Sequence, residues 1–501
     1  MDALSYATLE KIGYQGYLAP RSLPEKVLQF GEGNFLRAFV DNFFDRANEA
    51  GNFGGKIVAI TPINSGTGLI DALNAQDGLY TVVTRGKRDG RVVDEKRVVS
   101  SVSRFLSPYV PDQYAQIVEL ACSPAVEIIV SNTTEAGISY DDSCRPTDEP
   151  PASFPAKLAV LLHKRWEAGL PGVIILSCEL IDRNGAELLR IVKRHAADWG
   201  WEDAFIAWLE EGCTFCTTLV DTIVPGRIRD PREVEAFEAE QGYADPCAAV
   251  REPFEMWGIQ GDDDLEAALP FKGLSGVFVT PDVTPYKKRK VRILNGAHTG
   301  FVPGAWLAGF DIVRDCMHDS AVCGFMDGLL ADEVIPTLAE DLDVEDCKRF
   351  ARTVRDRFDN PYIDHQLLSI CLNSVAKWTA RDLPTLLDCV ELTGKLPRRL
   401  TASLAFLLAF YTTGFQGLEE DGLHLRRADG TEYTAHDDRA VLEFFAAHAE
   451  DDAPTLASAA LGDERLWGRA LNEVPGLEAA VAADLGLIRS NGAMAPFDAC
   501  R

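Results

Sequence analysis

The first half of the chain alternates short apolar runs with stretches of helical periodicity. Four apolar runs have the length of buried strands, at residues 27–30, 56–60, 126–130 and 173–176. Helical patterns follow the first and the last of these runs, at residues 35–47 and 186–195. Strands that alternate with helices are typical of βαβ units. We therefore predict an α/β fold with a parallel-rich sheet in this half.

The second half has a different pattern, because strand signals fade from about residue 286 onward. Asp319 is placed to cap an amphipathic helix that runs toward Val334, and a helix at residues 402–411 is closed by Gly414. A chain of 501 residues also exceeds the size at which one core usually stops growing. Pro281 and Pro285 mark the change. The expected domains are residues 1–280 and a mainly helical domain at residues 281–501.

The composition of the chain limits the kinds of molecule that the protein is expected to bind. The formal charge of −28 argues against nucleic acid, although a small anion in a locally basic pocket stays compatible with it. No apolar run is long enough to span a bilayer, and the first residues lack a secretory signal. We therefore expect a cytoplasmic protein that binds neither a membrane nor nucleic acid.

Twelve cysteines are scattered without paired spacing, which is typical of reduced thiols. Cys213 and Cys216 form a C-x-x-C, but no second pair or histidine cluster lies at the spacing of a zinc site. These two cysteines are expected to be core residues, and no metal is expected.

The first strand is followed by Gly31-Glu32-Gly33, which opens a helix. A dinucleotide fold needs glycines there so that the backbone turns sharply and approaches the pyrophosphate. The third glycine of the usual fingerprint is replaced by Leu36, and no acidic residue ends the second strand, where Ile60 leads into Thr61. A tight turn without a ligand stays an alternative, and the preference between NAD and NADP is left open.

The most informative segment is basic and then half apolar. Five of the six residues at 287–292 are basic, and Ile-Leu-Asn-Gly-Ala-His follows. If the segment is an α-helix, Lys290, Asn295 and His298 fall within an arc of about 140°. They would then share a pocket. The alternative is a buried, hydrogen-bonded asparagine and histidine with no catalytic role.

Those three residue types suit the reduction of a ketone. Hydride reaches the carbon while negative charge grows on the oxygen, so a nearby acid must deliver a proton. Lys290 can do this if neighbouring cations depress its pKa. Asn295 can donate a hydrogen bond to the developing alkoxide, and His298 can bind a substrate hydroxyl.

The spacing Lys-Val-Arg-Ile-Leu-Asn-Gly-Ala-His resembles the signature of the mannitol dehydrogenase family, the polyol-specific long-chain dehydrogenases. Further similar stretches cover nearly the whole chain, at residues 29–41, 76–81, 131–137, 177–185, 219–221, 357–361 and 365–370. The resemblance implies a Rossmann-type first domain, a helical second domain and a site in the cleft between them. It also implies metal-independent reduction of tagaturonate to altronate with NADH, with Lys290 as general acid and base.

The resemblance further implies two sets of binding residues. The cofactor set lies in the glycine turn, after the third strand and at Asp221, and comprises Gly31, Gly33, Asn34, Phe35, Arg37, Asn132, Thr133, Glu135 and Asp221. The substrate set comprises Lys287, His365, Lys377 and Asn184. Arg381 is a further candidate for a substrate carboxylate, but its neighbour Asp382 favours a surface ion pair.

This sequence departs from its mannitol-oxidising relatives at two positions. Leu180 stands where they carry an asparagine, so their second oxyanion donor is missing and its replacement is not evident. Lys287 stands where they carry a glutamate, three residues before the lysine. A cation in place of an acid is what a substrate carboxylate would require.

Other functions stay open at this point. Within the family they are fructuronate reductase, mannitol 2-dehydrogenase and mannitol-1-phosphate dehydrogenase. Outside it they are a nucleotide-binding sensor and, with less support, a metal-dependent dehydrogenase. The sequence leaves open the stereochemistry that separates tagaturonate from fructuronate, as well as the oligomeric state.

Overall fold

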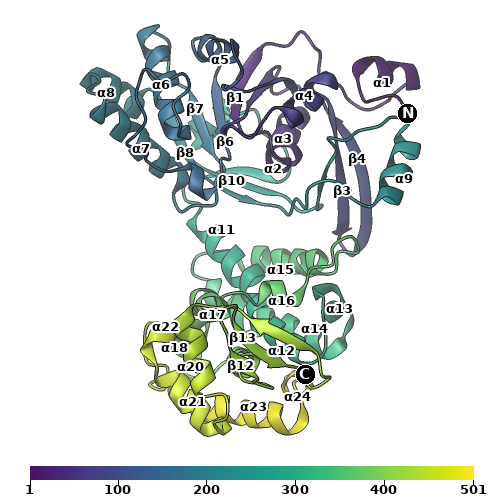
Figure 1. Cartoon of the computed structure of the whole chain (residues 1–501), viewed down its shortest axis with the longest axis vertical. Coiled ribbons are helices and arrows are strands. Elements are labelled where there is room, and N and C mark those ends of the chain that lie inside the picture. Colours follow the sequence, from purple (N-terminus) through teal and green to yellow (C-terminus); the bar gives the residue numbers. More distant parts are fainter. The chain divides into compact units, whose positions relative to one another are not determined.

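The computed structural model describes residues 1–501, which divide into two compact units (Figure 1). The first unit comprises Met1–Arg85 and Val93–Val283, and the second comprises Gly86–Val92 and Thr284–Arg501. The short stretch that belongs to the second unit is the turn of a hairpin between β3 (Tyr80–Arg88) and β4 (Arg91–Val99). No helix is both long enough and apolar enough to cross a membrane.

The first unit is built on an eight-stranded sheet in the order β11-β10-β8-β7-β6-β1-β2-β5. From β5 to β8 every neighbouring pair is parallel, whereas β10 runs antiparallel to β8. The strands are β1 (Glu25–Phe30), β2 (Lys56–Ile60), β5 (Val102–Leu106), β6 (Ile128–Ser131), β7 (Ile174–Ser177), β8 (Thr214–Asp221), β10 (Met256–Gln260) and β11 (Val277–Thr280). The predicted α/β fold of Rossmann type is confirmed.

Helices cover both faces of this sheet, and each face has its own apolar core. One core packs the sheet against α2 (Asn34–Ala38), α3 (Val40–Glu49), α4 (Gly68–Ala75) and α10 (Asp263–Ala268). The other packs it against α5 (Gln113–Ala121), α6 (Phe154–Glu167), α7 (Asn184–Asp198) and α8 (Asp203–Glu211). Alternate strand residues supply the two cores, as in β1, where Val27 belongs to one and Leu28 to the other.

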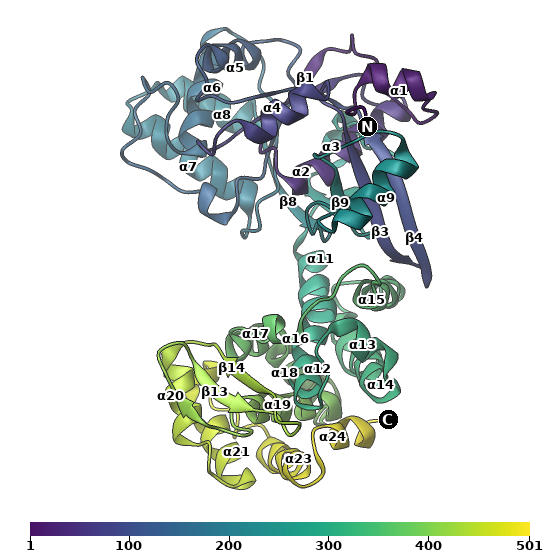
Figure 2. The same cartoon turned by 45° about the vertical axis from the view of Figure 1, so that its right-hand side comes forward.

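A second sheet in this unit has the order β4-β3-β9, with β9 at Ala249–Arg251. A small apolar cluster joins it to α1 (Tyr6–Ile12) and α9 (Pro231–Gln241), which lie beside it (Figure 2). The pattern of the sequence did not predict this sheet.

The second unit is mainly helical, as predicted. Its central helices, α12 (Gly296–Leu307) and α19 (Arg398–Phe410), are buried along most of their length. They approach closely because α12 carries glycine: a Cβ at Gly304 would lie 2.5 Å from the ring of Phe406. Around them lie α11 (Thr284–Arg289), α13 (Val313–His318), α14 (Ser320–Gly328), α15 (Val344–Phe358), α16 (Leu367–Ile370), α17 (Ser374–Arg381), α18 (Leu383–Thr393), α20 (Arg439–Ala447), α21 (Ala453–Gly462), α22 (Glu464–Trp467), α23 (Leu477–Asn491) and α24 (Met494–Ala499).

The structure adds details that periodicity did not predict. The helix expected at residues 35–47 is divided at Phe39 into α2 and α3. Asp319 does cap α14, by accepting hydrogen bonds from two backbone N–H groups, but the helix continues as a π-helical segment at Leu329–Val334. A small sheet in the order β12-β13-β14, at Gly417–Leu418, Leu423–Arg426 and Glu432–Ala435, interrupts the helices of the second unit.

Two helical glycines allow a matched test of the close packing in the first unit. A Cβ at Gly185 in α7 would lie 2.4 Å from the backbone carbonyl of Cys216 in β8, whereas one at Gly486 in α23 would meet no atom within 4 Å. We expect Gly185→Ala to lower the free energy of unfolding by about 1–3 kcal/mol. Gly486→Ala should raise it by up to about 1 kcal/mol. Denaturant titration of both variants measures this, and equal effects would contradict the packing.

Candidate active site

The parallel strands of the first unit bring several predicted site residues to one edge of the sheet. Phe30, Ser131 and Ser177 are aligned at the carboxyl ends of β1, β6 and β7, and Ser177 pairs with Thr217 in the middle of β8. The winding of the chain reverses between β1 and β6, and open α/β sheets bind ligands at such a point. The glycine turn and the loop after β6 both begin at this place.

The glycine turn has the geometry that a dinucleotide needs. Gly31 has a φ of 129°, which glycine adopts readily, and a Cβ there would lie 3.0 Å from the carbonyl oxygen of Asn132. Gly33 is exposed, and a Cβ there would meet no atom within 4 Å. The turn is therefore tight on its inner side and open on its outer side, where a pyrophosphate has room.

Arg37 stabilises the glycine turn from its buried side. Its side chain is buried and donates to the carbonyl oxygens of Glu32 and Cys247 and, at 2.7 Å, to Oδ1 of Asn34. The guanidinium also lies 5.2 Å from the ring centre of Tyr80. Its hydrogen bonds thus go to the protein. We revise its predicted role from cofactor ligand to positioning residue.

The loop after β6 is held by a buried carboxylate. Glu179 accepts hydrogen bonds from the backbone N–H of Thr133 at 2.9 Å and from the hydroxyls of Thr133 and Ser131. Asn132 donates to the carbonyl of Cys178, and Glu135 is exposed on a short 3₁₀ turn. The side chain of Thr133 is therefore engaged by Glu179, whereas Glu135 faces solvent together with its neighbours Thr134 and Ala136.

Asn184 was predicted to bind substrate, but in the structure its side chain hydrogen-bonds to the protein backbone instead. Its amide nitrogen donates to the carbonyl oxygens of Ser177, Glu179 and Thr218, at 2.9–3.0 Å. Its amide oxygen accepts from the N–H groups of Gly185 and Thr218. No hydrogen-bonding capacity is left for a ligand, so the prediction is corrected: Asn184 joins the carboxyl ends of β7 and β8. Leu180 is 63% exposed nearby in sequence and offers no donor.

In the second unit, the predicted catalytic segment is not a regular α-helix. Residues Lys290–Asn295 form a π-helical segment between α11 and α12. Such segments are rare and recur at functional sites. A π turn takes in more residues than an α turn, so Asn295, five positions after Lys290, comes back toward the same side of the axis. Lys290, Asn295 and His298 are all half-buried.

The cations that flank Lys290 are directed to different neighbours. Arg289 pairs with Asp346, Lys288 with Asp341, and Arg292 with Asp388 at 2.9 Å. Arg292 also donates to Thr385 at 2.8 Å. Two of these pairs anchor the basic run to α15 and α18, and the three pairs together largely cancel three of its charges. Three of the four cations that were expected to act on Lys290 are thus paired with carboxylates.

His298 lies in an aromatic setting. Its ring stacks on Phe358 with centroids 3.8 Å apart, and His365 stands edge-on to it at 5.4 Å. The Nε2 atom is buried and has no hydrogen-bond partner. Burial lowers the pKa of His298 well below its ordinary value, and nearby basic groups lower it further: His365, Arg381, Arg357 and Lys377. The ring is therefore neutral at neutral pH and has an unused polar atom.

These four groups, which we call the cation cluster, bring basic side chains together around His298. Lys377 and Arg381 lie one turn apart on α17, and burial lowers the pKa of each. Arg381 is half-buried and donates to Thr299 at 3.0 Å, so the predicted surface ion pair is wrong. Asp382 is instead fully buried, and burial raises its pKa well above the ordinary value. The sequence did not predict this arrangement, because spacing alone does not show which way the side chain of Arg381 points.

The remaining predicted residues are placed as follows. Lys287 is exposed near the end of α11, three positions before Lys290. Asp221 is buried at the end of β8, and Phe35 packs against the core of the first unit. Their proposed roles stay predictions. Cys213 and Cys216 are free, buried thiols.

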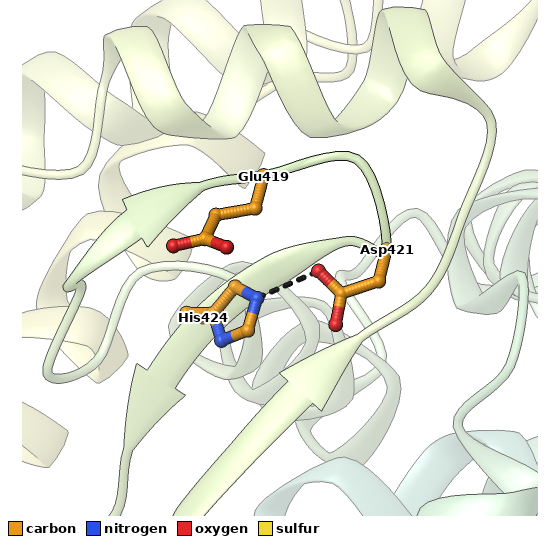
Figure 3. Close-up of side chains that lie close together, drawn as sticks. All are labelled: Glu419, Asp421 and His424. Carbon is orange, nitrogen blue, oxygen red and sulfur yellow. Dashed lines mark hydrogen bonds and ion pairs between the residues drawn. The ribbon is translucent and has the colours of Figure 1, made fainter.

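One group of side chains has the composition of a metal site, but it lies elsewhere (Figure 3). Glu419, Asp421 and His424 come from β13 and the loop that precedes it, and their ligand atoms lie within 4.8 Å of one another. The 2.8 Å hydrogen bond that His424 donates to Asp421 raises the pKa of His424, which favours the charged ring over the neutral ring that binds metals. We assign no metal to this exposed group.

Comparison with known sequences decides the family. A profile described as the mannitol dehydrogenase Rossmann domain matches residues 25–272, and one described as the mannitol dehydrogenase C-terminal domain matches residues 282–488. The chain belongs to the mannitol dehydrogenase family. The resemblance stated from the motifs is therefore confirmed.

Curated relatives of this mannitol dehydrogenase family member match along nearly its whole length. Altronate oxidoreductase of Klebsiella pneumoniae (strain 342) is 43% identical over 477 residues, which cover 94% of this chain and 95% of that protein. Altronate oxidoreductase of Bacillus subtilis (strain 168) is 39% identical, with 97% of each chain covered. The predicted class of enzyme, an oxidoreductase, is confirmed.

Solved structures support the fold of this family member. Substrate-free D-sorbitol dehydrogenase matches with a TM-score of 0.80 at 21% identity, covering 99% of this chain and 100% of that one. The ternary complex of Pseudomonas fluorescens mannitol 2-dehydrogenase with NAD and D-mannitol matches with a TM-score of 0.67 at 24% identity, covering 99% of both chains.

A buried carboxyl group beneath the glycine turn gives a pH-dependent test. Asp41 is fully buried and accepts a 2.6 Å hydrogen bond from Tyr80, and burial raises its pKa to about 7. The folded protein therefore keeps a proton that the unfolded chain releases above its ordinary pKa of 3.8. The stability that this proton confers is present at low pH and is lost as the pH rises through about 7.

We expect Asp41→Asn to remove this dependence. Relative to the wild type, the variant should gain stability between about pH 5 and pH 8.5, as measured by denaturant titration at both pH values. Asp71→Asn, at an exposed position of α4, is the control. A stability difference between Asp41→Asn and wild type that is the same at both pH values would contradict the assignment.

Proposed function

We propose that this enzyme reduces tagaturonate to altronate with NADH, and that Lys290 is the proton donor. Family membership and full-length relatives named altronate oxidoreductase support this reaction. The observation that carries the choice of a charged substrate is the cation cluster around His298. The proposal includes no metal, and it places the enzyme in the cytoplasm with no nucleic-acid or membrane partner.

The cation cluster calls for an anion. No carboxylate is among the groups that shift the pKa of His298, although Asp382 acts on Arg381 and Asp437 on Lys377. Like charges in a partly buried setting repel one another, so the arrangement is stabilised when an anionic ligand enters it. Arginine and lysine bind a carboxylate through charge-assisted hydrogen bonds. His365, Lys377 and Arg381 are thus proposed to hold the substrate carboxylate, with Lys287 as a further cation.

The residues of the chain divide the chemistry between them. Bound NADH supplies the hydride that adds to the ketone carbon. As that bond forms, Lys290 transfers a proton from Nζ to the carbonyl oxygen, and Asn295 donates a hydrogen bond to the same oxygen. His298 is neutral, and its unpartnered Nε2 accepts or donates a hydrogen bond to a substrate hydroxyl. The alcohol leaves with both atoms of hydrogen, and Lys290 regains its proton from solvent.

The first unit contains residues that fit the cofactor. The open outer side of the turn at Gly33 and the exposed Glu135 lie at the two loops that leave β1 and β6. Gly31, Gly33 and Asn34 are proposed to hold the pyrophosphate, and Asn132 and Glu135 the nicotinamide side, with Thr133 fixing the loop through Glu179. Arg37 and Glu179 act through these residues by fixing the two loops.

The first test compares substrates and removes the proton donor. NADH oxidation is followed at neutral pH with tagaturonate, fructuronate and fructose, using wild type, Lys290→Ala and the control Lys288→Ala. We expect turnover to be fastest with tagaturonate, and kcat/KM to fall by about 10²–10⁴ in Lys290→Ala only. Faster turnover of fructuronate or fructose would reassign the substrate, and an active Lys290→Ala would refute the proton donor.

The second test concerns the cation cluster. Arg381→Gln should raise the KM for tagaturonate by about 10- to 100-fold, the value of a charge-assisted hydrogen bond, and leave the affinity for NADH unchanged. Arg352→Gln, at an exposed position of α15, is the control. An unchanged KM in Arg381→Gln would contradict its role. A parallel loss of NADH affinity would indicate a general structural effect instead.

A further inference from the structure

The tip of the hairpin between β3 and β4 contacts the end of α15. Residues Gly86–Val92 form this tip, which is the part of the hairpin that belongs to the second unit. Lys87 donates to the carboxylate of Asp359, the residue that follows the last turn of α15. The backbone N–H of Gly90 donates to both carboxylate oxygens of Asp356, at 3.1 and 3.2 Å. The hairpin is thus fastened to α15 at two points.

The local sequence fixes the shape of this tip. Asp89 and Gly90 are the two residues between the strands, and their φ angles of 53° and 73° are both left-handed. A two-residue turn with two such angles has the twist that the flanking strands need, and Asp-Gly is among the pairs that adopt it most readily. The side chain of Lys87 and the N–H group of Gly90 are therefore presented to α15 from a defined turn.

The contact at Asp359 is shielded and shared. The side chains of Lys87 and Asp359 are only 21% and 22% exposed, so solvent weakens their attraction less than that of a surface pair. The other oxygen of the carboxylate lies 2.8 Å from Nε2 of His318 on α13. A cation beside the carboxyl end of α15 is also favoured by the helix dipole. Asp359 is therefore held from two sides.

This fastening lies directly beside the residues proposed to bind the substrate. Phe358 immediately precedes Asp359, and its ring stacks on His298 with an interplanar angle of 11°. Arg357, a member of the cation cluster, precedes Phe358, and His365 follows six positions after Asp359. A displacement of the end of α15 would move Phe358 and Arg357 together.

We propose that Lys87 is a positioning residue for the substrate: by holding Asp359, it fixes the end of α15 and so keeps Phe358 stacked on His298. The inference rests on the proposed function for the role of His298 and the cation cluster. Lys87 itself touches none of the proposed catalytic groups. It lies 272 positions from Asp359 in the chain, so no local pattern points to this role. Misplacing a binding group by about 1 Å can lower the rate by about 10².

The kinetic test compares two lysines of the same hairpin. Lys87→Gln removes the pair with Asp359, whereas Lys96→Gln removes equally shielded pairs with Asp94 and Glu240. We expect kcat/KM for tagaturonate to fall by about tenfold or more in Lys87→Gln only, with the affinity for NADH unchanged. Lys87→Arg keeps the cation and should restore most of the activity. Equal kcat/KM in Lys87→Gln and Lys96→Gln would overturn the inference.

A second readout is independent of the substrate. The ring current of Phe358 displaces the ring-proton resonances of the stacked His298, and the chain has only eight histidines. Spectra of protein with ¹³C-labelled histidine therefore follow this one ring, with His298→Gln to identify its signal and Phe358→Leu to give the unstacked position.

We expect Lys87→Gln to move the His298 signal toward its position in Phe358→Leu, and Lys96→Gln to leave it in place. A His298 signal that is the same in Lys87→Gln and wild type would overturn the inference whichever substrate the enzyme uses. A wild type that reduces fructose faster than tagaturonate would instead overturn the proposed function, and the His298 signal would still decide the role of Lys87.

Discussion

Electrostatic repulsion within the second unit is the constraint on which the account of this enzyme depends. Three cations of the basic run are compensated by Asp346 on α15, Asp388 on α18 and Asp341 just before α15, and this pairing holds the π-helical segment in place. The cation cluster gathers several basic groups around His298, and no carboxylate is among the groups that shift the pKa of that histidine. The fold can keep those groups together because α17 directs two of them and the aromatic stack on Phe358 fixes His298. A substrate carboxylate relieves the repulsion between these groups. The same interaction therefore gives the enzyme both its affinity for the substrate and its selectivity for an anion.

In the first unit, the glycine turn must be held rigidly while its outer side stays open. Arg37, Glu179 and Asn184 are buried, and each hydrogen-bonds to backbone groups in the sheet or in the loops next to it. A buried polar side chain with all its partners in place fixes its neighbours more firmly than an exposed one. These residues therefore act on the cofactor through the loops, while glycine at Gly31 and Gly33 leaves the edge of the sheet accessible.

Much of this could be predicted from the sequence, for identifiable reasons. The runs at β1, β2, β6 and β7 are continuous and apolar because both faces of those strands are buried. Long-range contacts account for what was missed: the π turn depends on Arg292 reaching Asp388, the inward direction of Arg381 depends on Thr299, and the use of Asn184 depends on β8. Local patterns contain none of these partners.

The most direct test of the central claim is the affinity of the NAD⁺-loaded enzyme for altronate compared with altritol, which has a hydroxymethyl group in place of the carboxylate. Calorimetry at low ionic strength would measure both. The account predicts that altronate binds about 10- to 100-fold more tightly, and that salt narrows the difference. Equal affinities at low salt would contradict it, because the cation cluster would then not recognise the carboxylate.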